Sequence, residues 1–205
     1  MAQRELERAP ARGHRAAVAV EPAVRDVREV PEVPEVRDAT IAELVIAARD
    51  GHAVAFATLY ARFHRAVHAV ALARVALADA GDVVQDVFAD AWQKLPALRE
   101  PAAFAGWLMT MARHRAIDVA RRRPAVDEVP EIAVAPAPRA EAAAALAAIR
   151  ALPETYRETL IMRLVEGLSG PEIAERTGMT PDSVRVHLSR GLKLLRQRLD
   201  GEGPR

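Results

Sequence analysis

The sequence predicts an all-α protein made of two small helical domains joined by a flexible, proline-rich linker, with a helix-turn-helix near the C-terminus. Three observations favour this class. Apolar residues make up 51% of the chain and aromatic residues only 4%. Much of the apolar content is alanine, which favours closely packed helices over stacked sheets. Apolar side chains recur at helical spacing on both sides of residues 124–140. That stretch itself holds four prolines and three acids, which is typical of a semi-extended linker.

Composition and charge narrow the function classes. The 205 residues include no cysteine, so disulfides and thiolate metal sites are excluded, and we expect a cytoplasmic protein. No apolar run approaches the roughly 20 residues of a membrane span, so we expect no membrane association. The net charge of +1 hides two basic blocks, with +4 over residues 101–123 and +5 over 183–198, separated by −3 over 124–145. This distribution predicts two contacts with one polyanion.

The chain begins with a stretch that has little capacity to fold. Residues 1–38 repeat Pro, Val and Glu without helical periodicity, so we expect a disordered extension. Thr40 then fits the N-cap of a short helix that ends near Asp50. A longer amphipathic helix is expected from Ala53 to about Leu77.

Catalytic and metal chemistry find no support in the sequence. It contains no Gly-rich phosphate loop, catalytic triad or cluster of metal ligands, so we expect neither an enzyme nor a bound cofactor. His64 and His68 have the one-turn spacing of zinc ligands, but no third ligand lies near them in the sequence. We therefore expect no metal site.

An acidic helix is expected next. Residues 80–81 predict a break in the chain, and Asp82 fits the cap of the helix DVVQDVFADAWQKL. One face of this helix is apolar, and the other carries Asp82, Asp86 and Asp90 at four-residue spacing. Like charges at this spacing cost a few tenths of a kcal/mol per pair. The charges alone fit a basic partner surface and an ordinary solvated face equally well.

A loop over residues 98–103 leads to a long basic helix, FAGWLMTMARHRAIDVARRR. Its first half is apolar and its second half is cationic, beyond what the helix dipole requires. We expect Trp107 to lie in the core and Asp118 to bridge Arg115 or Arg122. Pro124 ends the helix and opens the linker.

The C-terminal part predicts four helices, of which the first two cover residues 142–152 and the stretch from Pro153 to Gly167. The last two form a helix-turn-helix, since Ser169 and Glu172 make a capping box and Gly178 suits a left-handed helix end.

The last helix has the features of a DNA reader. Thr180 fits its N-cap, with Pro181 at the first helical position. No acid occurs between residues 183 and 198, so the helix suits a major groove, with cations for phosphates and Arg or Ser for base edges.

Taken in order, these motifs resemble the extracytoplasmic-function family of bacterial RNA polymerase sigma factors, which have two conserved domains called regions 2 and 4. DVVQDVFADAWQKL is similar to the core-polymerase-binding helix, the long basic helix to the one that opens the promoter −10 element, and the helix-turn-helix to the −35 reader. The resemblance implies five segments: an N-terminal extension at 1–38, region 2 at 39–123, a linker at 124–140, region 4 at 141–200 and a tail at 201–205.

The resemblance also implies sites and partners. The residues expected to bind core polymerase are Asp82, Gln85, Asp86, Asp90 and Trp92. Those expected at the −10 element, including a loop that pockets a flipped base, are Leu98, Arg99, Ala102, Ala103, Trp107, Arg113, His114, Arg115, Arg121 and Arg122. Those expected at the −35 element are Thr180, Ser183, Arg185, Val186, His187, Ser189, Arg190 and Lys193. His114 stands where the family commonly has Asn.

The implied partners are promoter DNA, an anti-sigma factor, the coiled coil of the polymerase's largest subunit and the flap of its second-largest subunit. Two other functions compete with this interpretation. A stand-alone helix-turn-helix regulator with an N-terminal sensing domain would bind its DNA site without polymerase. A protein with basic helices that binds no DNA would show no salt dependence in a filter-binding series.

Overall fold

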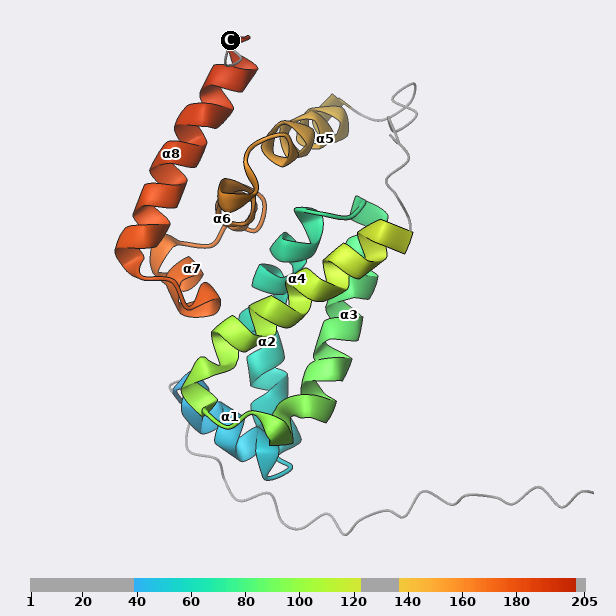
Figure 1. Cartoon of the computed structure of the whole chain (residues 1–205), viewed down its shortest axis with the longest axis vertical. Helices are drawn as coiled ribbons and strands as arrows, with labels where there is room; N and C mark the ends of the chain where they lie inside the picture. Colours follow the sequence, from blue (N-terminus) through green and yellow to red (C-terminus); the bar gives the residue numbers. More distant parts are fainter. Residues whose placement is uncertain (1–38, 123–136, 202–205) are drawn as a thin grey trace, which may run out of the picture. The chain divides into compact units, whose positions relative to one another are not determined.

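The computed structural model describes residues 39–122 and 137–201, all within one compact unit, Glu35–Arg205. The described residues form α-helices, two short 3-10 helices and no strand, which confirms the predicted all-α class (Figure 1). The predicted N-terminal extension, Arg123, most of the predicted linker and all of the tail but its first residue lie outside the described residues.

Four α-helices make up the N-terminal half of the described chain. They are α1 (Ile41–Arg49), α2 (Ala53–Leu72), α3 (Leu77–Lys94) and α4 (Phe104–Arg122), with the 3-10 turns η1 (Leu95–Ala97) and η2 (Pro101–Ala103) between the last two. The predicted cap of α1 is confirmed: Thr40 and Glu43 form a reciprocal capping box. Gly51 follows the helix end with φ 92°, a left-handed conformation that glycine adopts without steric cost.

The boundary between α2 and α3 differs from the prediction. Helix α2 ends at Leu72, and α3 already begins at Leu77, so residues 80–81 lie within α3 and do not break the chain. A glycine inside a helix costs about 1 kcal/mol relative to alanine. Burial of Ala80, Val83 and Val84 along the same helix offsets that cost. Asp82 is therefore a residue of the second helical turn and not an N-cap.

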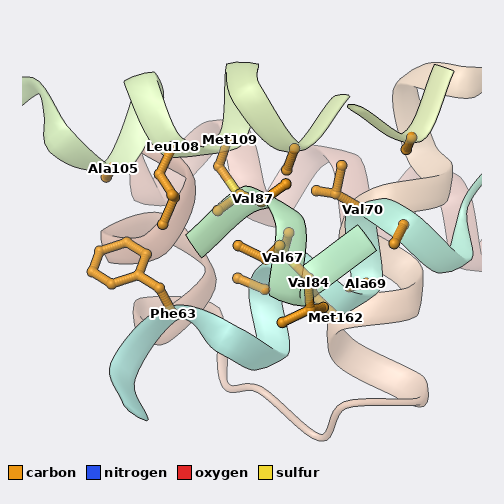
Figure 2. Packing of buried hydrophobic residues seen from close by; sticks show 14 of the residues in the cluster. Phe63, Val67, Ala69, Val70, Val84, Val87, Ala105, Leu108, Met109 and Met162 are labelled. Atoms are coloured by element: carbon orange, nitrogen blue, oxygen red, sulfur yellow. The ribbon is translucent and has the colours of Figure 1, made fainter. Parts of the chain in front are cut away.

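The core of this half forms where α2, α3 and α4 meet, as Figure 2 shows. Its buried members include Phe63, Val67 and Val70 of α2, Val84 and Val87 of α3, and Leu108 and Met109 of α4. The ring of Phe63 meets that of Phe104 edge-on, with centroids 5.2 Å apart. Burying each large apolar side chain stabilises the fold by roughly 1.5–3 kcal/mol. This core fixes the exposed faces of α3 and α4.

Four more helices make up the C-terminal half. They are α5 (Ala137–Arg150), α6 (Glu154–Leu164), α7 (Gly170–Thr177) and α8 (Pro181–Leu199). Helix α5 begins at Ala137, inside the stretch predicted as linker, because a proline such as Pro138 in the first helical turn removes no hydrogen bond. The alanine-rich sequence that follows then favours the helix.

The helix-turn-helix is confirmed in its local chemistry. Ser169 and Glu172 form the predicted capping box, and Gly178 ends α7 in the left-handed conformation, with φ 73°. The Thr180 side chain caps α8 by accepting from the Ser183 N–H. Gly191 lets α8 approach α6 closely, because a Cβ there would lie 2.9 Å from a methyl carbon of Leu160.

None of the helices in the described ranges combines the length and the apolar character that a membrane crossing requires.

Candidate nucleic-acid and polymerase interface

The acidic face of α3 is partly neutralised by α4. We call Asp82, Asp86 and Asp90 the acidic stripe. Arg115 of α4 places its Nε 3.5 Å from Asp86 Oδ2 and its Nη2 4.0 Å from Asp90 Oδ2. Lys94 Nζ lies 3.1 Å from the same Asp90 oxygen. The sequence predicts that Asp118 bridges Arg115 or Arg122; Arg115 instead contacts the acidic stripe. This contact offsets the repulsion among the carboxylates of the stripe.

An apolar surface adjoins the acidic stripe. Trp92 is 42% exposed, and its ring packs edge-on against Phe56 with centroids 4.7 Å apart. Ala53, Phe56, Phe88, Ala89 and Trp92 line a shallow, open hollow. Exposed aromatic residues beside charged ones are typical of protein interaction sites. Of these five residues, the sequence analysis assigned only Trp92 to a site. Phe88 and Ala89 lie one turn before it on α3, whereas Ala53 and Phe56 become its neighbours only through the packing of α2 against α3.

The segment before α4 combines a buried anchor with small exposed side chains. Leu98 is only 9% exposed and belongs to the core. Arg99, Ala102 and Ala103 are exposed. The Glu100 carboxylate accepts from the N–H of Ala102 at 3.3 Å, which shapes the turn. Among the predicted −10 residues of this segment, Leu98 therefore has a structural position and the others are free to meet a ligand.

The basic residues of α4 differ in their contacts and in their exposure to solvent. Arg113 forms hydrogen bonds with Glu158 of α6, whereas His114 is exposed. Arg121 and Arg122 are exposed at the C-terminal end of the helix. Trp107 is half-buried against Phe104, with ring centroids 5.9 Å apart, so it contributes to the core as expected. The predicted −10 residues are thus spread along α4 and do not form one cluster.

Helix α8 presents a continuous basic face. The exposed members of the predicted −35 set are Thr180, Arg185, Val186, Ser189, Arg190 and Lys193. From Arg185 on, their spacing of one and four residues places them on one side of the helix. Ser183 is half-buried beside the Thr180 cap. His187 is half-buried as well, and its ring meets Tyr156 edge-on at 5.7 Å, so it faces α6 and not the exposed side.

The two singled-out histidines have ordinary partners. His68 Nδ1 lies 2.6 Å from Glu166 Oε1, and the His64 ring stacks on Tyr60. Within residues 39–122 and 137–201, no three His, Cys, Asp or Glu side chains are placed to hold a metal ion.

Sequence reasoning missed the contacts between the two halves of the chain. Arg74, in the turn between α2 and α3, binds Glu154 and Glu158 of α6. Arg150 of α5 donates to the backbone carbonyls of Leu72 and Val75. These partners are about 75 to 84 residues apart in the sequence, so no local spacing pattern predicts their contacts.

Comparison with known proteins identifies the two halves of the chain. Residues 59–125 match the family model described as Sigma-70 region 2, and residues 142–195 match the model described as Sigma-70, region 4. The fold and these two matches define a sigma factor of the sigma-70 class.

Among its relatives is the ECF RNA polymerase sigma factor ShbA of Streptomyces griseus, 32% identical over 131 residues, which cover 56% of this chain and 69% of ShbA. Another is the probable RNA polymerase sigma factor RfaY of Xanthomonas campestris, 34% identical over 149 residues, which cover 65% of this chain but only 37% of RfaY. The chain belongs to the extracytoplasmic-function (ECF) family of RNA polymerase sigma factors. A solved structure of CnrH, a sigma factor of Cupriavidus metallidurans, in complex with the cytosolic domain of CnrY, matches with a TM-score of 0.56 and 27% identity, covering 80% of this chain and 99% of CnrH.

Proposed function

We propose that this chain binds core RNA polymerase and directs it to promoters whose −35 element is read by α8 and whose −10 element is held open by α4 and the segment before it. The exposed basic face of α8, set on a fully capped helix-turn-helix, is the observation that carries this proposal. Residues 183–198 of this helix include no acid, so its surface beyond the first turn suits a duplex groove, where cations neutralise phosphates and polar side chains reach base edges.

We propose the acidic stripe with its apolar hollow as the polymerase contact. Exposed carboxylates next to Trp92 complement a basic partner surface, and the coiled coil of the largest subunit is the partner that the family resemblance suggests. The same resemblance assigns the flap of the second-largest subunit to the helix-turn-helix half.

The proposal for the −10 contact is supported by energetics. Unstacking a base step in duplex DNA costs a few kcal/mol, so a protein that opens DNA has to bind the exposed base and strand. Small exposed residues at 102–103 leave room for an extruded base, and the cations of α4 suit the strand's phosphates. In this scheme the polymerase performs the chemistry. The chain acts in the cytoplasm, is not an enzyme and needs no cofactor.

We further propose an anti-sigma partner. The solved relative CnrH is bound to the cytosolic domain of CnrY, and 99% of that CnrH chain aligns with this one. A partner of the same kind as CnrY could bind to surfaces of both halves of this chain.

Run-off transcription with purified core polymerase tests the proposal. Wild-type protein should support promoter-dependent transcripts, and Asp86→Arg should abolish core binding because it places a cation in the acidic stripe beside Arg115. Asp50→Arg makes the same charge change at an exposed position at the end of α1 and should bind core normally. Core binding by Asp86→Arg at the wild-type level would show that the acidic stripe is not the contact. Specific promoter binding without polymerase would instead support a stand-alone regulator.

A further inference from the structure

Glu158 of α6 holds the arginine that we assign to the −10 strand. Arg113 Nε donates to Glu158 Oε1 at 2.9 Å, and Arg113 Nη2 donates to Oε2 at 2.8 Å. Arg74 Nη2 lies 2.8 Å from the same Oε1 atom. The Glu158 side chain is only 12% exposed, whereas Arg113 keeps 38% of its side chain exposed. One carboxylate therefore occupies the donor edge of an arginine that solvent still reaches.

This two-point geometry is also the one with which a guanidinium binds a phosphate. Two parallel N–H donors fit two oxygens of a carboxylate or of a phosphate group equally well. The hydrogen bonds that Arg113 donates to Glu158 raise the pKa of Arg113 above its ordinary value, so the side chain stays cationic. Because the same donors serve either anion, Arg113 cannot bind Glu158 and a DNA phosphate in this way at the same time.

The Glu158 contact is one of several that hold the C-terminal half of the described chain against the N-terminal half. Arg150 donates to the carbonyls of Leu72 and Val75 where α2 ends, Arg176 donates to the carbonyl of Arg62, and His68 meets Glu166. Apolar packing continues across the boundary, because Met162 of α6 is fully buried in the same cluster as the residues of α2 and α3 (Figure 2). Polar contacts and apolar packing together therefore hold α6 against the N-terminal half.

The docked arrangement affects the two proposed DNA contacts differently. The basic face of α8 remains exposed, including Arg185 and Arg190. Arg113, in contrast, is occupied. A chain in this arrangement is ready to meet duplex DNA through α8, while its contact with the melted strand is blocked.

We propose that Glu158 takes the place of a backbone phosphate of single-stranded −10 DNA, so that α6 and the DNA strand compete for Arg113. The inference rests on the assignment of Arg113 to the −10 strand under the proposed function. Release of α6 frees Arg113, and binding of a single strand displaces α6. The exchange is reversible because one charge-assisted contact replaces another of the same kind.

The test measures how the free full-length chain binds a fluorescein-labelled oligo(dT) strand, which probes backbone contacts without sequence readout. Glu158→Gln keeps the shape of the side chain but loses its charge, and should raise the affinity for the strand about tenfold by increasing the competent fraction of the protein. Glu154→Gln is the matched control. It lies one turn earlier on α6, removes the same charge and also contacts Arg74, but does not contact Arg113, so its affinity should stay within about twofold of wild type.

The double variant Arg113→Ala with Glu158→Gln should lose the gain. Equal gains from Glu158→Gln and Glu154→Gln would show a general charge effect and overturn the proposal, as would wild-type affinity in Glu158→Gln. Arg113→Ala alone, tested in run-off transcription with core polymerase, separates the two proposals. Normal transcription by Arg113→Ala would show that Arg113 does not contact the −10 strand, and the proposed assignment would fail. A transcription defect in Arg113→Ala, together with wild-type strand affinity in Glu158→Gln, would refute only the proposed competition.

A second measurement does not depend on affinity. The chain has no cysteine, so Arg49→Cys and Arg198→Cys provide two exposed and unique dye positions, one in each half. Saturating oligo(dT) should lower energy transfer between the dyes in the otherwise wild-type chain. Unchanged transfer at saturation would show that the strand binds without displacing α6, and would overturn the proposal.

Discussion

Arg185 and Arg190 stand on the exposed face of α8, and the nearest acid is Asp182, which lies 3.1 Å from Arg185. We expect each Ala substitution to weaken −35 binding by roughly 1–3 kcal/mol, because each removes a cation from the groove-facing surface. Promoter-binding titrations with the reconstituted holoenzyme measure the effect. Arg198→Ala, at the end of the same helix, should leave binding near wild type. Unchanged promoter selection in both variants would mean that another face of α8 enters the groove.

His187 illustrates what a single-residue reading of a basic helix overlooks. Its residue type suits a base edge, and its role at the −35 element stays a prediction. In the structure, however, its ring turns toward Tyr156. A signal was present in the sequence, since His187 stands three residues after Val184 and four before Gly191, both of which are buried. Helical periodicity places residues at this spacing on one face.

At the scale of elements, the start of α7 depends on ionised Glu172. The hydrogen bond from the Ser169 N–H, helped by the Ser169 hydroxyl, lowers the pKa of Glu172. A lowered pKa in the folded state means that the stabilisation is present above the unfolded-state pKa of about 4.3 and is lost as the pH falls through the folded value. We expect Glu172→Gln to cost less than about 1 kcal/mol at pH 7, because the side chain is largely solvated.

Urea unfolding of Glu172→Gln at pH 7 and at pH 3 measures this contribution. The difference from wild type should shrink at the lower pH, because the wild-type carboxyl takes up a proton as the pH falls toward its lowered pKa. Glu175→Gln, on the same helix but outside the capping box, should show little change at either pH. A difference between Glu172→Gln and wild type that persists undiminished at pH 3 would contradict the role of the ionised cap.

Element ends were predictable where their chemistry is local. The caps at Thr40, Ser169 and Thr180 and the left-handed Gly178 each depend on side chains within three residues, and all four are confirmed. The start of α3 was misplaced, because a glycine inside a helix was interpreted as a break. The start of α5 was misplaced for a related reason, since a proline in a first turn belongs to the helix.

At the scale of the molecule, the two halves share one buried cluster. Ile149, Leu152 and Met162 of the C-terminal half lie in the same core as Val67 and Val70 of α2. We therefore expect the free chain to unfold in a single calorimetric transition, with the van't Hoff enthalpy equal to the measured enthalpy. Two resolved transitions in the wild-type chain would show that the halves unfold independently and that their packing contributes little.

Such long-range packing was beyond the reach of the sequence. Arg113 and Glu158 are 45 residues apart, and each looks like an ordinary charged residue of an amphipathic helix. The acidic stripe and the basic face of α8 were predictable, because helical spacing alone gathers their residues. The apolar hollow beside Trp92 and the ion pairs of Arg74 depend on how helices pack, and no spacing rule contains that information.

Arg115 gives the acidic stripe a thermodynamic consequence. The guanidinium that we propose for the −10 strand lies against Asp86 and Asp90. A basic protein surface that binds these carboxylates takes over their counter-charge and releases Arg115 toward a nucleic-acid strand. By linkage, the factor by which polymerase binding raises the affinity for the strand equals the factor by which the bound strand raises the affinity for polymerase. The affinity between the sigma factor and polymerase would then be higher on open DNA than in the absence of DNA.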